Sequence, residues 1–205
     1  MIAIIDYGMG NVGSIKNMFS KIGVESIITS KEEDLLASNG IILPGVGAFD
    51  KAINNLSKLD LFKTLNEIAV NNKKPILGIC LGMQIMAKFS EEGTVKGLGW
   101  IDAKVKKFNF IENYKNLKIP HMGWNKLSLK KKSKLISDDE VSSRYYFVHS
   151  YYFSPNNEKD VLAETEYGIK FACAIEKDNL FGVQFHPEKS HKYGMKILKN
   201  FSNIA

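Results

Sequence analysis

The sequence predicts an α/β fold: an open, twisted, mostly parallel sheet with helices on both faces, plus a partly antiparallel extension. Short apolar runs at residues 2–6, 40–43 and 75–79 have the length of strands that are buried on both sides, as in a parallel sheet. Amphipathic helical patterns separate these runs, which indicates repeated β-α-β units. The middle third of the chain instead has consecutive short strand patterns, and these predict the antiparallel extension.

Length and composition indicate one domain. The 205 residues, of which 44% are hydrophobic, suffice for one sizeable core, and no block of sequence differs as a second domain would. We therefore expect a single domain over residues 1–205.

The cysteines and the first residues predict a cytoplasmic protein. The chain has two cysteines, Cys80 and Cys173, and a reactive thiol of the kind inferred below for Cys80 would be wasted in an oxidising compartment. Residues 1–6 carry no positively charged leader, and no apolar run approaches the roughly 18 residues that span a bilayer. We expect neither secretion nor association with a membrane.

The net charge of +6 raises the question of nucleic acid as a partner. Lysines gather at residues 104–107 and 126–134, but Arg144 is the only arginine. Proteins that read bases and phosphates favour the bidentate guanidinium of arginine. The lysines are therefore interpreted as a solvated surface, or as a face that docks an acidic partner, and no nucleic acid is expected.

The first β-α unit carries a glycine pattern that resembles a nucleotide-binding loop. Strand 2–6 is followed by the loop 7–11 and by a helix with an apolar face formed by Ile15, Met18, Phe19 and Ile22. Gly8, Gly10 and Gly13 have the spacing of a dinucleotide fingerprint, but no acidic residue ends the second strand at residues 24–29. Nucleotide binding is therefore disfavoured.

The third strand leads into a second glycine-containing loop. Residues 30–33, Ser-Lys-Glu-Glu, predict a capping box at the start of a short helix before strand 40–43. The strand ends in Pro44-Gly45-Val46-Gly47, at the carboxyl edge where open α/β sheets hold their sites, and glycines there let backbone N–H groups approach a ligand. An ordinary strand-to-helix turn is an equal alternative at this point. Helical patterns then pass through Leu56 and residues 61–70.

Cys80 lies at the junction between the next strand and a predicted helix over residues 81–89. The pattern Gly78-x-Cys80-x-Gly82 matches a nucleophile elbow, in which glycines permit a tight turn that exposes the nucleophile above the sheet. At a helix N-terminus, free N–H groups and the helix dipole favour the reactive thiolate. A buried, inert thiol is the alternative for a lone cysteine, but both glycines favour a nucleophile.

The middle third of the chain contributes strands and two histidines among aromatic residues. Here His121 and His149 are interpreted as hydrogen-bonded core residues, because neither has a pattern that indicates catalysis. The predicted strands cover residues 100–108, 118–122, 126–129, 145–153, 161–166 and 171–176.

The last strand, residues 180–185, runs into His186-Pro187-Glu188. The proline fixes the backbone, so both flanking side chains can project to the same side, as a base and the group that orients it. A surface turn is the alternative when this segment is considered alone. A closing helix over residues 193–201 is expected to turn Met195, Leu198 and Phe201 inward.

Together, the segments 44–47, 78–84 and 182–188 resemble the class I, or triad-type, glutamine amidotransferases. Residues 120–125, Pro-His-Met-Gly-Trp-Asn, and 147–151, Phe-Val-His-Ser-Tyr, look like the glutaminase subunit of imidazole glycerol phosphate synthase. The resemblance covers essentially the whole chain. Residues 11–14, Asn-Val-Gly-Ser, depart from the Asn-Leu-Arg-Ser that is frequent in that subunit. This departure keeps open a related glutaminase that serves a sugar amidotransferase of cell-surface glycan synthesis.

The resemblance implies a Cys80-His186-Glu188 triad that hydrolyses L-glutamine, and it implies no cofactor and no metal. A thiolate attacks the side-chain amide, the histidine carries the proton, and the glutamate orients the imidazole. The Leu81 N–H is a candidate oxyanion donor. By resemblance, Gly45, Val46 and Gly47 supply a second donor once a partner is engaged, and Gln84 corresponds to a residue that contacts glutamine.

The resemblance also implies a separate chain that receives the ammonia. A glutaminase fold consumes nearly all of the sequence, and free ammonia is largely protonated at neutral pH, so we expect a heterodimer with a barrel-fold cyclase of histidine biosynthesis. Docking is expected near residues 120–125 and 146–151, whose large aromatic side chains suit an interface as well as a core. A cysteine peptidase or esterase, or a binding module without activity, remains an alternative class.

Overall fold

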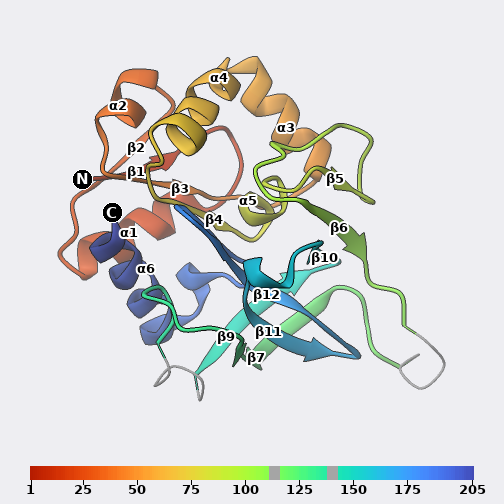
Figure 1. Cartoon of the computed structure of the whole chain (residues 1–205). Coiled ribbons are helices and arrows are strands. Elements are labelled where there is room, and N and C mark those ends of the chain that lie inside the picture. Colours follow the sequence, from red (N-terminus) through yellow and green to blue (C-terminus); the bar gives the residue numbers. More distant parts are fainter. Residues whose placement is uncertain (111–115, 138–142) are drawn as a thin grey trace.

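The structure is a computed structural model of the whole chain, and it describes residues 1–110, 116–137 and 143–205. Within these residues the chain forms an 11-stranded mixed sheet and a separate two-stranded sheet (Figure 1). The main path of the large sheet runs β2-β1-β3-β4-β13-β12-β10-β6-β5; β11 joins it at β12, and β8 pairs with β11. The expected α/β class, with its partly antiparallel extension, is confirmed.

Five neighbouring strands form the parallel part of the sheet. They are short and apolar because helices cover both of their faces, and every residue of β1, β3, β4 and β13 is buried. The strands are β2 (Ser26–Thr29), β1 (Ile2–Ile5), β3 (Gly40–Leu43), β4 (Ile76–Ile79) and β13 (Leu180–Val183). All four pairings between them are parallel.

The helices lie in two layers (Figure 1). One layer holds α2 (Glu32–Ala37), α3 (Phe49–Lys58) and α4 (Leu61–Asn66), which continues into a π-helical turn at Glu67–Asn71. The other holds α1 (Val12–Lys21) and α6 (His191–Ile204). The two layers pack into two separate hydrophobic clusters, since side chains of α2, α3 and α4 belong to one and those of α1 and α6 to the other.

The remaining strands make the antiparallel extension. The strands β6 (Ala103–Lys107), β10 (Tyr151–Pro155), β11 (Val161–Tyr167) and β12 (Ile169–Lys177) pair in antiparallel fashion. The short strands β5 (Phe89–Ser90) and β8 (Ser128–Leu129) lie at the margins, and a 3-10 turn at Glu158–Asp160 precedes β11. The separate sheet pairs β7 (His121–Lys126) with β9 (Arg144–His149).

The predicted helix over residues 81–89 is wrong in length, because α5 covers only Leu81–Gln84. Backbone groups that would continue the helix bind a distant segment instead. The Leu98 N–H donates to the Ile85 carbonyl at 2.8 Å, and the Lys88 N–H donates to the Ala103 carbonyl at 3.1 Å. Long-range pairing therefore overrides the local helix propensity, and the chain enters β5.

Three smaller expectations are also corrected. The capping box at residues 30–33 does not form, because Lys31 is the N-cap and has no side-chain capping bond, while Thr29 Oγ1 accepts the Lys31 N–H. The single strand predicted over residues 145–153 is divided at Ser150 into β9 and β10, which belong to different sheets. Met195 is only half-buried, whereas Leu198 and Phe201 face inward as expected. Among the described residues, no helix is long and apolar enough to cross a bilayer.

Candidate active site

Sheet topology brings the three sequence motifs to one edge. The segment 44–47 follows β3, Cys80 follows β4, and His186 follows β13, and these three strands are neighbours in the order β3-β4-β13. Because the strands are parallel, their carboxyl ends meet at the same edge, where ligands bind in open α/β sheets. Residues that lie about 100 positions apart in sequence therefore share one site.

Cys80 occupies a strained turn between β4 and α5. Its φ of 54° and ψ of −108° lie outside the regions that L residues favour. A Cβ on Gly82 would lie 1.8 Å from the Leu43 carbonyl oxygen, and one on Gly78 would lie 2.6 Å from the Met83 nitrogen. The flanking glycines are therefore required by close backbone contacts, which explains the elbow pattern in the sequence.

The Cys80 side chain is less accessible than the sequence suggested. Only 7% of the residue is exposed, whereas the elbow pattern predicted a thiol that stands in solvent. The cover comes from neighbouring residues of the site, since Cys80 lines a cavity together with Leu81 and His186. The thiol therefore faces the cavity rather than open solvent.

His186 and Glu188 form a buried pair. His186 Nδ1 and Glu188 Oε1 are 2.8 Å apart, and the two side chains are 1% and 2% exposed. The turn Pro187–Lys189 fixes their separation, and the Ser190 hydroxyl donates to the His186 carbonyl at 2.6 Å. A carboxylate at Nδ1 keeps the proton on that nitrogen and leaves Nε2 available to exchange one.

The charge environment of His186 favours its protonated form. Burial alone would lower the pKa of His186, but the Cys80 sulfur and the Glu188 carboxylate raise it to about 10. His186 Nε2 is buried and makes no regular hydrogen bond with the described residues, yet it lies near enough to Cys80 for the sulfur to affect its pKa. The three side chains thus have the order of a cysteine, a base and an orienting carboxylate.

The expected oxyanion donors are placed differently from the sequence prediction. The Leu81 N–H donates to the Gly45 carbonyl at 3.4 Å, so it does not point freely into the cavity. The Tyr7 hydroxyl donates to the Pro44 carbonyl at 2.5 Å and anchors the segment that carries Gly45. Gly47 has a φ of 106°, which favours glycine, and Val46 is exposed.

The cavity at this edge has a volume of about 460 Å³, which suits a small polar molecule. The sequence predicted six of its lining residues as site residues: Val46, Gly47, Cys80, Leu81, Gln84 and His186. Pro120, Val148, His149, Ser150 and Tyr151 belong to the segments that the sequence assigned to docking, whereas Glu92 and Lys189 were not anticipated. Gln84 Nε2 donates to the Tyr151 carbonyl at 3.0 Å and to Gln184 Oε1 at 2.9 Å.

Glu92 is the acidic side chain that sequence reasoning missed. Its Oε2 accepts the Phe49 N–H at 3.0 Å, which fixes the carboxylate at the start of α3. Burial raises the pKa of Glu92, and this bond opposes that effect. No sequence spacing signals its position, because Glu92 lies in a loop that long-range contacts bring to the cavity.

The two histidines of β7 and β9 pair with each other. His149 Nδ1 lies 2.8 Å from the Tyr151 carbonyl, which can only accept, so His149 Nε2 accepts from His121 Nδ1 at 3.1 Å. Burial lowers the pKa of His121 to about 4 and that of His149 to about 3, so both rings are neutral. This arrangement agrees with the expectation of hydrogen-bonded core histidines, although His149 also lines the cavity.

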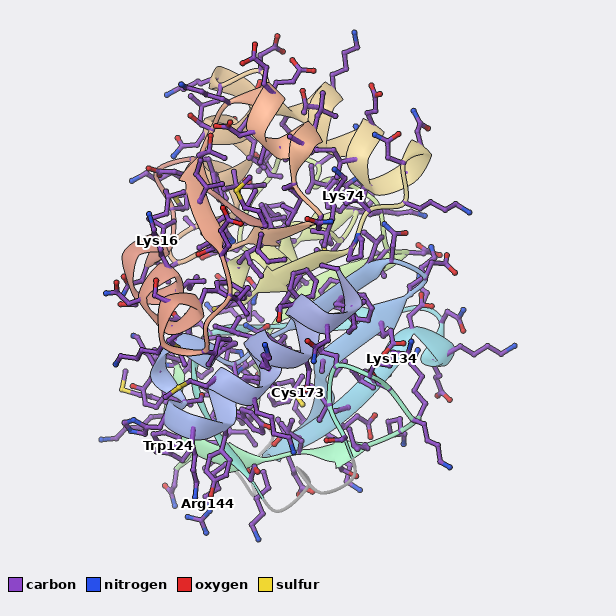
Figure 2. The ribbon with its side chains drawn as sticks, turned by 90° about the vertical axis from the view of Figure 1, so that its left-hand side faces the viewer. Lys16, Lys74, Trp124, Lys134, Arg144 and Cys173 are labelled. Carbon is purple, nitrogen blue, oxygen red and sulfur yellow. The ribbon has the colours of Figure 1, made fainter. Side chains whose placement is uncertain are left out.

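Cys173 lies on β12 (Figure 2), and its carbonyl accepts the Gln184 N–H at 2.8 Å, so it stands level with Cys80 but on the far side of the β13 segment. It is fully buried, and burial raises its thiol pKa. We expect a diazo or chloroketone analogue of glutamine to modify Cys80 alone, as measured by peptide mass spectrometry. Labelling of Cys173 at a similar rate would contradict the assignment of the two thiols.

Comparisons with known proteins show the family to which the chain belongs. The family model for class-I glutamine amidotransferases matches residues 3–204. The imidazole glycerol phosphate synthase subunit HisH 2 of Methanococcus maripaludis is 54% identical over 205 residues, and the subunit HisH of Leptospira interrogans is 44% identical over 204, with all of each chain covered. A solved glutamine amidotransferase has a TM-score of 0.75 at 17% identity, covering 100% of this chain and 98% of the other, so it shows the fold alone. The chain therefore belongs to the class-I glutamine amidotransferase family.

Proposed function

We propose that the chain is the glutaminase subunit of imidazole glycerol phosphate synthase, and that it forms a single domain over residues 1–205. In this role it hydrolyses L-glutamine to L-glutamate and ammonia, and the ammonia passes to a cyclase subunit that makes imidazole glycerol phosphate and AICAR in histidine biosynthesis. The main support for this chemistry is that Cys80 and His186 line the same cavity and that Glu188 is paired with His186. The full-length relatives named above support the pathway.

The first chemical step is attack on the side-chain amide of glutamine. The thiolate of Cys80 forms a bond to the amide carbon, and the carbonyl oxygen takes up the negative charge. The tetrahedral intermediate then expels ammonia, which receives its proton from His186 Nε2. A glutamyl thioester on Cys80 remains.

The second step releases glutamate. His186 is now neutral at Nε2 and takes a proton from water, which attacks the thioester carbon. The carbon–sulfur bond breaks, glutamate leaves, and the thiolate of Cys80 and the imidazolium of His186 are restored. Glu188 holds the imidazole in the required tautomer in both steps.

Oxyanion stabilisation requires a change in the segment 44–47. The Gly45 carbonyl must turn away from the Leu81 N–H, after which that N–H and a backbone N–H of the segment can both face the oxyanion. The glycines at 45 and 47 permit such a rotation, and the exposed Val46 lies where a partner could induce it. We propose that the isolated chain is held in a weakly active state.

The cavity also holds groups that suit the amino-acid end of the substrate. We propose that the Glu92 carboxylate receives the α-ammonium group of glutamine. Gln84 uses both amide N–H groups on protein acceptors, so its carbonyl oxygen is the atom that can accept a hydrogen bond from the substrate.

Docking of the cyclase, which we propose to have a barrel fold in a heterodimer, is supported by apolar side chains beside the cavity. Met122 on β7 is 61% exposed, Trp124 is 43% exposed, and Ile119 just before β7 is 41% exposed. Figure 2 shows Trp124 at the margin of the molecule. Exposed Met and Trp side chains suit a protein interface better than a free surface. An enclosed interface here would deliver ammonia in its neutral form.

We expect little glutamine hydrolysis by the isolated chain and at least a tenfold activation by the cyclase with its ribonucleotide substrate. The test is glutamate release with and without both components. Full activity of the lone chain, or no binding to the cyclase, would refute the histidine-pathway assignment and favour the sugar amidotransferase alternative. Cleavage of peptides or esters in place of glutamine would indicate a hydrolase, and a Cys80 that iodoacetamide fails to label would indicate a binding module. Because the reactive thiol of Cys80 would be wasted in an oxidising compartment, we propose that the protein is located in the cytoplasm.

A further inference from the structure

Gln184 contacts the sulfur of Cys80 and belongs neither to the Cys-His-Glu triad nor to the cavity lining. It follows β13, two residues before His186, and its side chain is fully buried. Gln184 Nε2 donates to Cys80 Sγ at 3.5 Å. The Gln184 backbone N–H donates to the Cys173 carbonyl at 2.8 Å, which fixes the position of the residue in the sheet.

A chain of directional hydrogen bonds determines which end of the Gln184 amide faces the sulfur. The Tyr151 carbonyl can only accept, so Gln84 must present its Nε2 there at 3.0 Å. The second N–H of the same nitrogen then donates to Gln184 Oε1 at 2.9 Å. With its oxygen occupied, Gln184 can present only an N–H to Cys80.

Burial makes this orientation energetically significant. A buried amide that lacks partners is costly, and each end of the Gln184 amide has one here. Reversal of the Gln184 amide would place its NH2 group against the NH2 group of Gln84, donor against donor, and its oxygen against the sulfur. The network therefore has one satisfied arrangement, with a donor at the nucleophile.

We propose that Gln184 is a catalytic residue that stabilises the Cys80 thiolate by an N–H···S hydrogen bond, and that Gln84 is the positioning residue that orients it. This inference rests on the proposed glutaminase function. Unlike His186, an amide does not titrate, so its donor remains in place after the imidazolium has given its proton to ammonia. The same N–H then stabilises the sulfur as it leaves from the thioester in the second step.

The charged and titratable groups around the sulfur define what must be held constant in a test. Cys80 interacts electrostatically with His186 and Tyr7, and His186 interacts in turn with Glu188 and His149. Substitution of Gln184 by methionine removes the donor with little change in size and alters none of these groups. Substitution by glutamate keeps the shape but places a carboxyl group at the sulfur.

The experiment measures the rate at which iodoacetamide alkylates Cys80 as a function of pH, by mass spectrometry on the full-length chain. For Gln184→Met we expect the midpoint of the profile to rise by about one pH unit and the rate at neutral pH to fall about tenfold, as for a lost hydrogen bond to a charged group. Gln184→Glu should raise the midpoint of the alkylation profile further, because it places a carboxyl group at the sulfur. With the cyclase present, kcat for glutamine should fall about tenfold in Gln184→Met while KM is little changed.

A matched control is Thr165→Val, which removes a buried hydroxyl that donates to the Lys126 carbonyl at 2.7 Å on β11, outside the cavity. It should leave the alkylation profile of Cys80 unchanged. If Gln184→Met fails to fold, Gln84→Met serves instead, because it frees the Gln184 amide to rotate and should lower the alkylation rate about threefold.

A folded Gln184→Met variant with the wild-type alkylation profile would overturn the inference, as would a Gln184→Glu variant that reacts faster than wild type. Failure of the proposed function is distinguishable from these results. A wild-type chain that hydrolyses no glutamine with any partner, but whose Cys80 profile shifts as expected in Gln184→Met, would refute the glutaminase assignment and retain the role of Gln184.

Discussion

Replacement of Cys80 by alanine or serine is expected to abolish glutamine hydrolysis while the fold remains intact. Alanine lacks the sulfur that forms the thioester, and serine offers a hydroxyl that is far less ionised than a thiol. We expect turnover to fall about 10⁴-fold or more, the size of effect seen when a triad nucleophile is removed. The structural change is small, because either residue fits the space that a cysteine occupies in the elbow.

The measurement is glutamate release in the presence of the cyclase, together with thermal unfolding of each variant. Cys173→Ser on β12 and Cys80→Ser in the turn after β4 form a matched pair of thiol removals. Cys173→Ser should reduce stability, since its site on β12 is fully buried, but the folded fraction should retain its turnover. Glutamate release by Cys80→Ala at the wild-type rate would refute Cys80 as the nucleophile.

Much of the fold could be predicted from local patterns in the sequence. The parallel strands are apolar on both faces, so strand 40–43, and residues 180–183 of the strand predicted over 180–185, could be identified as buried strands without any contact information. The glycines around Cys80 reflect close contacts between neighbouring backbones, and this requirement leaves a pattern in the sequence. His186 and Glu188 lie within one turn, so their contact was also predictable.

Other features depend on distant residues and left no local pattern. The division of residues 145–153 between two sheets follows from the pairing of β9 with β7 and of β10 with β6. The end of α5 at Gln84 follows from bonds to residues that lie more than ten positions away.

Within the site, the same limit applies. Glu92 reaches the cavity on a loop, and Gln184 meets Gln84 across 100 residues of sequence. The bond from Leu81 to the Gly45 carbonyl depends on the conformation of the segment 44–47, which the sequence does not determine. The sequence could therefore predict which residue types assemble, but not the state of the oxyanion site.

His186→Asn is expected to reduce turnover nearly as much as loss of Cys80, by about 10⁴-fold, because no other described group contacts the sulfur as a base. Glu188→Gln should cost less, about 10²-fold. In this variant the amide oxygen of the side chain at position 188 can still accept a hydrogen bond from His186 Nδ1. The tautomer of His186 is therefore retained, but the negative charge beside it is lost.

The pH profile separates the two roles in the triad. The Glu188 carboxylate helps to raise the pKa of His186 to about 10, so its removal should lower that pKa. Since the imidazolium must protonate the leaving ammonia, the alkaline limb of turnover in Glu188→Gln should move to lower pH, while residual turnover in His186→Asn should lack this limb. The measurement is kcat between pH 6 and about 10 for each variant with the cyclase bound. If Glu188→Gln were the more damaging change, or if its alkaline limb moved to higher pH, Glu188 could not be the residue that orients and charges His186.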